Sequence, residues 1–155
     1  DTPIAGQSLL FEVQRDGVPV GQHRVNFTRD GEELRVETVF DLSIKLFALT
    51  LYSLEYTSQA RWRDGRLLAL KSRTDDDGTV SSVAATRIQD AFQVTGPDGT
   101  QTADGDLIPT NHWNVAVTAS ERVLLSSVLF STAAEHRSVK EFFCSTCRRR
   151  DDEKQ

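Results

Sequence analysis

The sequence predicts an all-β protein, a single domain whose antiparallel meander forms an open or partly closed barrel or a strongly curved sheet. The first observation is that six of the nine glycines follow an aspartate, and Asp-Gly tolerates the positive φ angles that two-residue hairpin turns require. The second is that apolar and polar residues alternate between these pairs, as in strands with one buried face. The third is the length of 155 residues, which suits one domain with its own core.

The expected strands follow one another along the chain. Residues 9–14 and 23–29 come first, and the clearest alternation then spans residues 34–46, where Thr38 lies among the apolar positions of one face. A helix would scatter these positions around its circumference. Residues 52–62 repeat the pattern, and residues 66–74, 80–88 and 91–96 complete it. Because the intervening turns are short, neighbouring strands should be antiparallel.

The C-terminal part of the chain is different. One helix is an option at residues 119–137, where Ser120 could cap and Val123, Leu124 and Val128 have helical spacing. The alternation stops near residue 133, which predicts a β domain at 1–132 and an irregular charged tail at 133–155. This tail carries Cys144 and Cys147 as a lone C-x-x-C. We favour two thiols without a function over a redox pair or a zinc site. The sequence does not decide whether the two cysteines form a disulfide.

Charge and hydropathy narrow the class of partner. The net charge is −5 and no basic stripe runs through the chain, which argues against nucleic acid. No apolar run approaches the roughly 20 residues of a membrane-spanning helix, so no transmembrane segment is expected. The chain begins at Asp1 and contains no methionine. This favours a mature chain whose signal peptide has been removed, and hence a periplasmic or otherwise exported location.

The stretch "PTNHWN" at residues 109–114 is the first candidate site. His112 could act as a general base or contact a ligand, with Asn114 orienting it. The favoured alternative is a strand entry in which Trp113 anchors the core while His112 and Asn114 bond nearby backbone. No nucleophile motif, phosphate loop or dinucleotide fingerprint occurs, so an enzyme is disfavoured. The three aspartates of "TDDDGT" fit a solvated turn better than a cation site, and no metal or cofactor is predicted.

Several motifs carry a resemblance to a known family. They are Val20-Gly21, the Trp-x-Asp-Gly-x-Leu of residues 62–67, the Thr-Asp-Asp-x-Gly turn of residues 74–78 and His-Trp-Asn at residues 112–114. Residues 9–126 resemble domain of unknown function family 6134, a family of exported bacterial proteins. The resemblance implies a signal peptide, an envelope location and an open, barrel-like sheet, distantly similar to periplasmic carriers of lipids or lipoproteins. It implies no catalytic residues. The chain departs from the family pattern after residue 114, which favours an exposed sheet edge.

The leading hypothesis is an exported binding protein that holds a hydrophobic small molecule or lipid on a concave sheet. An equally weighted alternative is that the apolar faces simply form the core, with Trp62 and Trp113 as plugs. A second function is structural, with an open edge joining an envelope protein or another copy of the chain. The least favoured is a hydrolytic enzyme using His112. The candidate ligand-binding residues are Phe40, Leu42, Tyr52, Leu54, Tyr56, Trp62, His112, Trp113 and Asn114.

Overall fold

The computed structural model describes residues 6–109, 122–124, 129–131 and 147–149, and every regular element among them is a strand. The all-β prediction is therefore confirmed. The strands are β1 (Ser8–Arg15), β2 (Val18–Asp30), β3 (Glu33–Leu46), β4 (Leu49–Arg63), β5 (Arg66–Asp76), β6 (Thr79–Ile88), β7 (Ala91–Gly96), β8 (Gly99–Asp104), β9 (Ile108–Pro109), β10 (Arg122–Leu124), β11 (Leu129–Ser131) and β12 (Cys147–Arg149).

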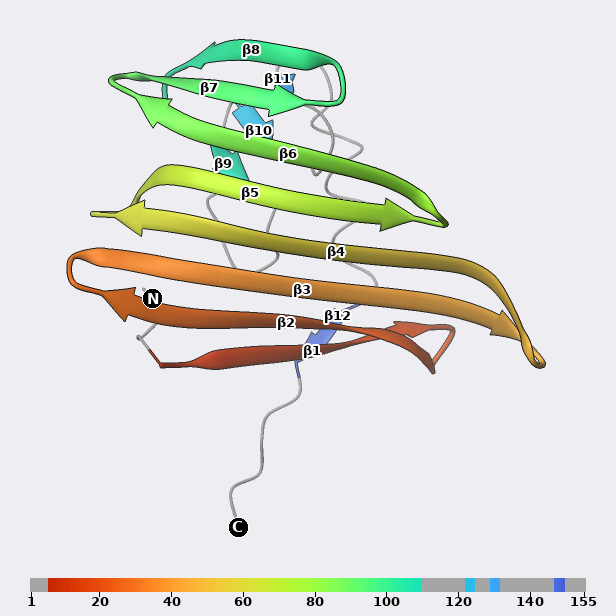
Figure 1. Cartoon of the computed structure of the whole chain (residues 1–155). Helices are drawn as coiled ribbons and strands as arrows, with labels where there is room; N and C mark the ends of the chain where they lie inside the picture. Colours follow the sequence, from red (N-terminus) through yellow and green to blue (C-terminus); the bar gives the residue numbers. More distant parts are fainter. Residues whose placement is uncertain (1–5, 110–121, 125–128, 132–146, 150–155) are drawn as a thin grey trace.

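One large sheet dominates the molecule. Strands β1 to β8 pair with their sequence neighbours as an antiparallel meander, and β12 adds to β1 at the other edge. The sheet curls but does not close, so it is open rather than a barrel (Figure 1). A small sheet of β9, β10 and β11 lies behind β5 to β8 in this view. Within it β9 and β10 are parallel, an exception to the predicted antiparallel order.

Three hairpins close with the predicted Asp-Gly geometry. Asp16, Asp64 and Asp77 have φ angles of 52°, 50° and 49°, and the glycine after each also has positive φ. Two other hairpins have no Asp-Gly pair, and a different residue adopts the positive φ angle in each turn. These residues are Phe47 between β3 and β4, at φ 55°, and Gln89 between β6 and β7, at φ 56°. Positive φ is uncommon for residues other than glycine and unusual for a bulky one.

Gly21 has a structural role that its place in the Val20-Gly21 motif did not explain. It pairs with Leu42 where β2 meets β3. A Cβ at this position would overlap the carbonyl oxygen of Asp41. The two backbones therefore approach so closely that only glycine fits.

The sequence missed β8 and β12, and it offered a helix where β10 and β11 are found. β8 has a single buried residue, Ala103, so its alternation carries little apolar signal. The optional helix at residues 119–137 is wrong where the structure describes it, because β10 and β11 lie there. Val123 and Leu124 pair with β11 instead of following helical spacing. Within the predicted tail, β12 is a described strand, whereas the division into 1–132 and 133–155 stays a prediction.

Candidate functional site

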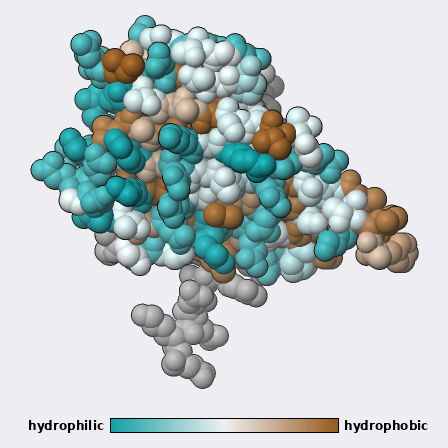
Figure 2. All heavy atoms as spheres, in the orientation of Figure 1, coloured by the Kyte–Doolittle hydropathy of each residue, from teal (hydrophilic) through white to brown (hydrophobic). Residues whose placement is uncertain are grey.

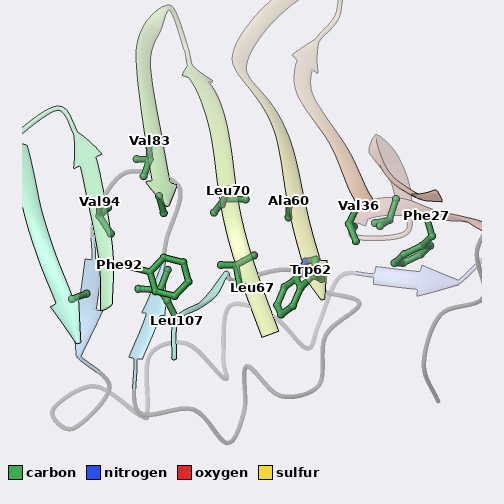
Figure 3. Packing of buried hydrophobic residues seen from close by; sticks show 13 residues of the cluster. Phe27, Val36, Ala60, Trp62, Leu67, Leu70, Val83, Phe92, Val94 and Leu107 are labelled. Atoms are coloured by element: carbon green, nitrogen blue, oxygen red, sulfur yellow. The ribbon is translucent and has the colours of Figure 1, made fainter. Parts of the chain in front are cut away.

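The inner face of the large sheet is the side on which the buried core residues lie. Its core end forms an apolar cluster across β2 to β8 in which Phe92 and Val25 are fully buried. Figure 3 shows these side chains projecting to the same side of neighbouring strands. The guanidinium of Arg87 stacks 4.5 Å from the Phe92 ring centre and donates a 2.6 Å hydrogen bond to Asp106. That hydrogen bond lowers the pKa of the Asp106 carboxyl. The core end is thus well packed, with an ion pair at its border.

Five of the predicted ligand-binding residues gather farther along the same face. Cross-strand pairing places Phe40 beside Tyr56 and Leu42 beside Leu54, and Tyr52 lies on the next inward position of β4. All five are half-buried, unlike the residues of the core end. We call them the wall: Phe40, Leu42, Tyr52, Leu54 and Tyr56.

Trp62, predicted as part of the same surface, lies elsewhere. It is 6% exposed and belongs to the core cluster with Leu67, its cross-strand neighbour across the β4–β5 turn (Figure 3). The Trp-x-Asp-Gly-x-Leu motif therefore builds a hairpin whose two apolar ends pack into the core. This placement favours the structural interpretation of Trp62.

A row of hydroxyl side chains separates the core end from the wall. Thr38, Ser58 and Ser72 are direct cross-strand partners on β3, β4 and β5, and Thr74 follows Ser72 at the next inward position. They are 1%, 4%, 7% and 8% exposed, respectively. Among the described residues, the oxygens of Thr38, Ser72 and Thr74 have no hydrogen-bond partner, and that of Ser58 has only its interaction with the Tyr56 phenol. We call them the hydroxyl row. Sequence reasoning noted Thr38 on an apolar face but did not connect it to the other three.

Unpartnered buried hydroxyls are costly. Leaving such a group unsatisfied costs about 1–3 kcal/mol, because it gives up water without gaining a partner. Three such hydroxyls, on β3 and β5, are therefore unusual for a surface that serves only as core. The row supplies donors and acceptors that face the same side as the wall.

The tyrosines of the wall have altered acidity. Burial raises the pKa of Tyr56, and the adjacent Ser58 hydroxyl partly offsets this by lowering it. A hydrogen bond to the Asp76 carboxylate is the main cause of the raised pKa of Tyr52. The Tyr52 phenol donates its proton to Asp76, and the Tyr56 phenol, like any tyrosine near neutral pH, is protonated and can act as a donor.

His23, on β2, lies next to the wall. It pairs with Phe11 on one side and Phe40 on the other. Its ring centre lies 5.6 Å from that of Phe11, stacked, and 5.9 Å from that of Phe40, edge-on. The side chain is 2% exposed. The signal was available in the alternation of residues 23, 25 and 27, all of which are buried.

The outer face is polar and has a different character. Glu37, Gln59 and Lys71 are cross-strand partners there, and the Gln59 amide donates to Glu37 at 3.4 Å. A shallow hollow of about 330 Å³ lies over β3 to β5, and its lining includes these three residues as well as Thr38, Ser58 and Ser72 of the hydroxyl row. Charged walls that open to solvent give an apolar ligand little to bind. This face is therefore the weaker candidate.

The Asp75–Asp77 turn adopts hairpin geometry. Asp75 accepts a hydrogen bond from the Gly78 amide at 3.0 Å and forms an ion pair with Arg73. No group of three or more His, Cys, Asp or Glu side chains in the described part of the chain could hold a metal ion. The same described residues contain no helix that is long and apolar enough to span a bilayer.

The remaining candidates lie outside the described residues. These are His112, Trp113 and Asn114, together with Cys144. Ile108 and Pro109, which precede the His-Trp-Asn motif, do form the predicted extended segment as β9. The roles considered for the motif itself stay predictions.

An open, curled antiparallel sheet built from consecutive hairpins defines the class of this protein. The family model for Domain of unknown function (DUF6134) matches residues 11–128, and the chain belongs to that family. Neither a curated protein nor a solved structure matches the chain. The family's motifs at Gly21, Trp62 and Asp77-Gly78 have the structural roles described above.

Proposed function

We propose that the protein is an exported binding protein for an amphipathic ligand, a lipid or similar molecule, held on the inner face. The apolar part of the ligand would lie along the wall. Its polar group would exchange hydrogen bonds with the hydroxyl row. The site is thus a graded surface on β3, β4 and β5, with the core end as its rigid support.

The observation that carries this proposal is the contiguity of the two surfaces. Tyr56 of the wall is the direct cross-strand partner of Thr74 of the hydroxyl row, and Ser58 follows Tyr56 at the next inward position. A ligand polar at one end and apolar at the other matches this order. A purely apolar ligand would leave the hydroxyls unpartnered, and a purely polar one would leave the wall uncovered.

A fluorescent long-chain fatty acid tests the proposal by titration into the purified full chain. We expect saturable binding with one molecule per chain and an emission shift that reports an apolar site. Leu42→Lys places a charge in the wall and should weaken binding at least about tenfold, since a buried apolar contact is replaced by a cation.

A matched control is available on the same strand. Val39 is 44% exposed on the outer face, opposite the hydroxyl row and wall. Val39→Lys adds the same charge to β3 and should leave fatty-acid affinity within twofold of the parent. Equal losses in both variants, or no saturable binding by the parent, would contradict the proposal.

Assembly through a sheet edge is the second candidate function. Its supporting observation is β8, which pairs only with β7 among the described strands. Strand addition to β8 would produce dimers or complexes with another β protein. Light scattering across a hundredfold concentration range distinguishes the two functions. A stable dimer abolished by Thr102→Pro would favour assembly, whereas a monomer that binds fatty acid would favour the inner-face site.

A further inference from the structure

The β3–β4 hairpin projects beyond the rest of the large sheet. β2 pairs with β3 only as far as Leu42, and β5 pairs with β4 only from Leu54 onward. Residues 43–46 and 49–52 therefore form a two-stranded ribbon that pairs with no other strand of the sheet. At about 3.4 Å per residue, the ribbon extends roughly 14 Å past the last residues that β3 and β4 pair with β2 and β5. Figure 1 shows this hairpin reaching farther than the turns beside it.

The end of this ribbon is apolar and exposed. Leu46, Phe47, Leu49 and Leu51 are 54%, 96%, 70% and 56% exposed, respectively, and we call them the hairpin tip. Single exposed apolar side chains are common, but four within six residues form a patch that indicates a contact surface. Figure 2 shows hydrophobic atoms concentrated at the projecting end of the molecule.

The sequence keeps this patch at a cost to the backbone. Phe47 occupies the turn with φ 55°, a region that disfavours bulky side chains. In the hairpins at Asp16, Asp64 and Asp77, an Asp-Gly pair adopts the positive φ angles of the turn. Leu51 is the extra residue of a bulge, since Ile44 pairs with Tyr52 and Lys45 with Thr50. Both features place an exposed apolar side chain near the end of the ribbon.

Polar residues adjoin the hairpin tip on the side that faces the rest of the sheet. Lys45 lies one position back from Leu46, and Tyr52 lies one position beyond Leu51 with its phenol bonded to Asp76. Apolar residues followed by Lys and Tyr match the polarity gradient from bilayer interior to headgroups. The tip is also convex. A bilayer accepts a narrow wedge of this shape, whereas a protein partner would need a groove that fits it.

We propose that the hairpin tip inserts into the interface of a lipid bilayer with electrically neutral headgroups. Neutral lipid is indicated by the carboxylates of Asp75, Asp76 and Asp77, which belong to the turn that bonds to Ser53 at the base of the ribbon. Arg73 forms an ion pair with Asp75, but Asp76 and Asp77 still outnumber Lys45 and would be repelled by an anionic surface. Insertion brings the outer end of β3 and β4 to the membrane. The inference stands apart from the ligand site and holds even if the wall binds nothing.

Flotation of the full-length chain with phosphatidylcholine vesicles tests the proposal. We expect the parent chain to float with the vesicles and Phe47→Gly to reduce the bound fraction at least fivefold. Glycine is the residue best suited to φ 55°, so Phe47→Gly should unfold at the same temperature as the parent or higher. Unfolding could then not explain a loss of vesicle binding by Phe47→Gly.

Ile88→Ser is the matched control. Ile88 is 52% exposed but precedes the β6–β7 turn, at the opposite end of the sheet from the hairpin tip (Figure 1). It should float as the parent does, and replacing half of the lipid by phosphatidylglycerol should not increase binding. The proposal is overturned if the parent fails to float, if Ile88→Ser and Phe47→Gly lose binding equally, or if only anionic vesicles bind. It is also overturned if Phe47→Gly leaves flotation unchanged but dissociates a dimer.

Discussion

The two ends of the inner face are built from the same strands and the same period-two alternation, yet they differ in composition and burial. At the core end Val36, Ala60 and Leu70 pair across β3, β4 and β5 and are 2% exposed or less. One inward position along, the corresponding residues are Thr38, Ser58 and Ser72. Beyond them the wall is only half-buried. Burial is therefore concentrated at the core end, and we expect most of the stability to come from there.

The largest difference should appear when the same side chain is truncated at each end. Leu70→Ala removes a leucine that is 2% exposed from the core end and should lower the free energy of unfolding by about 3 kcal/mol. Leu54→Ala in the wall should cost about 1 kcal/mol, because half-buried leucine leaves a smaller cavity and less lost burial. Urea denaturation measures both. Equal losses would show that the wall is core.

Gly21 sharpens the comparison at the junction of β2 with the wall. Gly21→Ala would press a methyl group against the Asp41 carbonyl and force β2 away from β3 next to Leu42. We expect a loss of about 2 kcal/mol in unfolding free energy. Gly17→Ala adds a Cβ that meets nothing within 4 Å but sits at φ 79°, so it measures the cost of an unfavourable backbone angle without any close contact. A smaller loss for Gly21→Ala than for Gly17→Ala would refute the close approach.

A substitution in the hydroxyl row should stabilise the protein, whereas the substitutions above destabilise it. Thr38→Val removes a buried, unpartnered hydroxyl and should raise the unfolding free energy of the ligand-free protein by about 1 kcal/mol. Val36→Thr, at the previous inward position of β3, introduces a buried hydroxyl and should lower it by about 1–3 kcal/mol. Thermal unfolding compares the two. If Thr38→Val destabilises the protein, the hydroxyl is already satisfied and the row is structural.

The smallest expected effect is a dependence of stability on alkaline pH. The pKa of Tyr56 is raised in the folded protein, chiefly by burial. Its contribution to stability is fully present below the unfolded pKa of about 10 and is lost as pH rises through the folded value. Tyr56→Phe should therefore flatten the fall in unfolding free energy above pH 10, measured by urea denaturation at several pH values. An unchanged slope would contradict this assignment.

Alternation predicted most of this fold because it reports directly on which side chains face the core. The residues of β3 and β4 lie on the expected faces, and the wall contains five of the predicted binding residues. The hydroxyl row was harder to predict. Serine and threonine at inward positions look like interruptions of the pattern in a single strand, and their alignment depends on the register between strands. β8 was missed because one buried alanine gives too little apolar contrast.

The exposed hairpin tip shows a second limit of sequence reasoning. The stretch "LFALTLYSL" is visibly apolar, and apolar strands are ordinarily assigned to the core. Its exposure follows from how far β2 and β5 extend beside it, which local patterning does not encode. Strand length relative to neighbours thus decides whether the same residues pack inside or face outward.

Native mass spectrometry of the full chain purified from an exporting host, followed by organic extraction, tests the central claim most directly. The claim is that the hydroxyl row and wall form a binding surface rather than an imperfect core. It predicts a co-purified amphipathic molecule, one per chain, that is lost in Leu42→Lys and kept in Val39→Lys. A chain that carries no ligand, together with destabilisation by Thr38→Val, would contradict it and assign the whole inner face to folding.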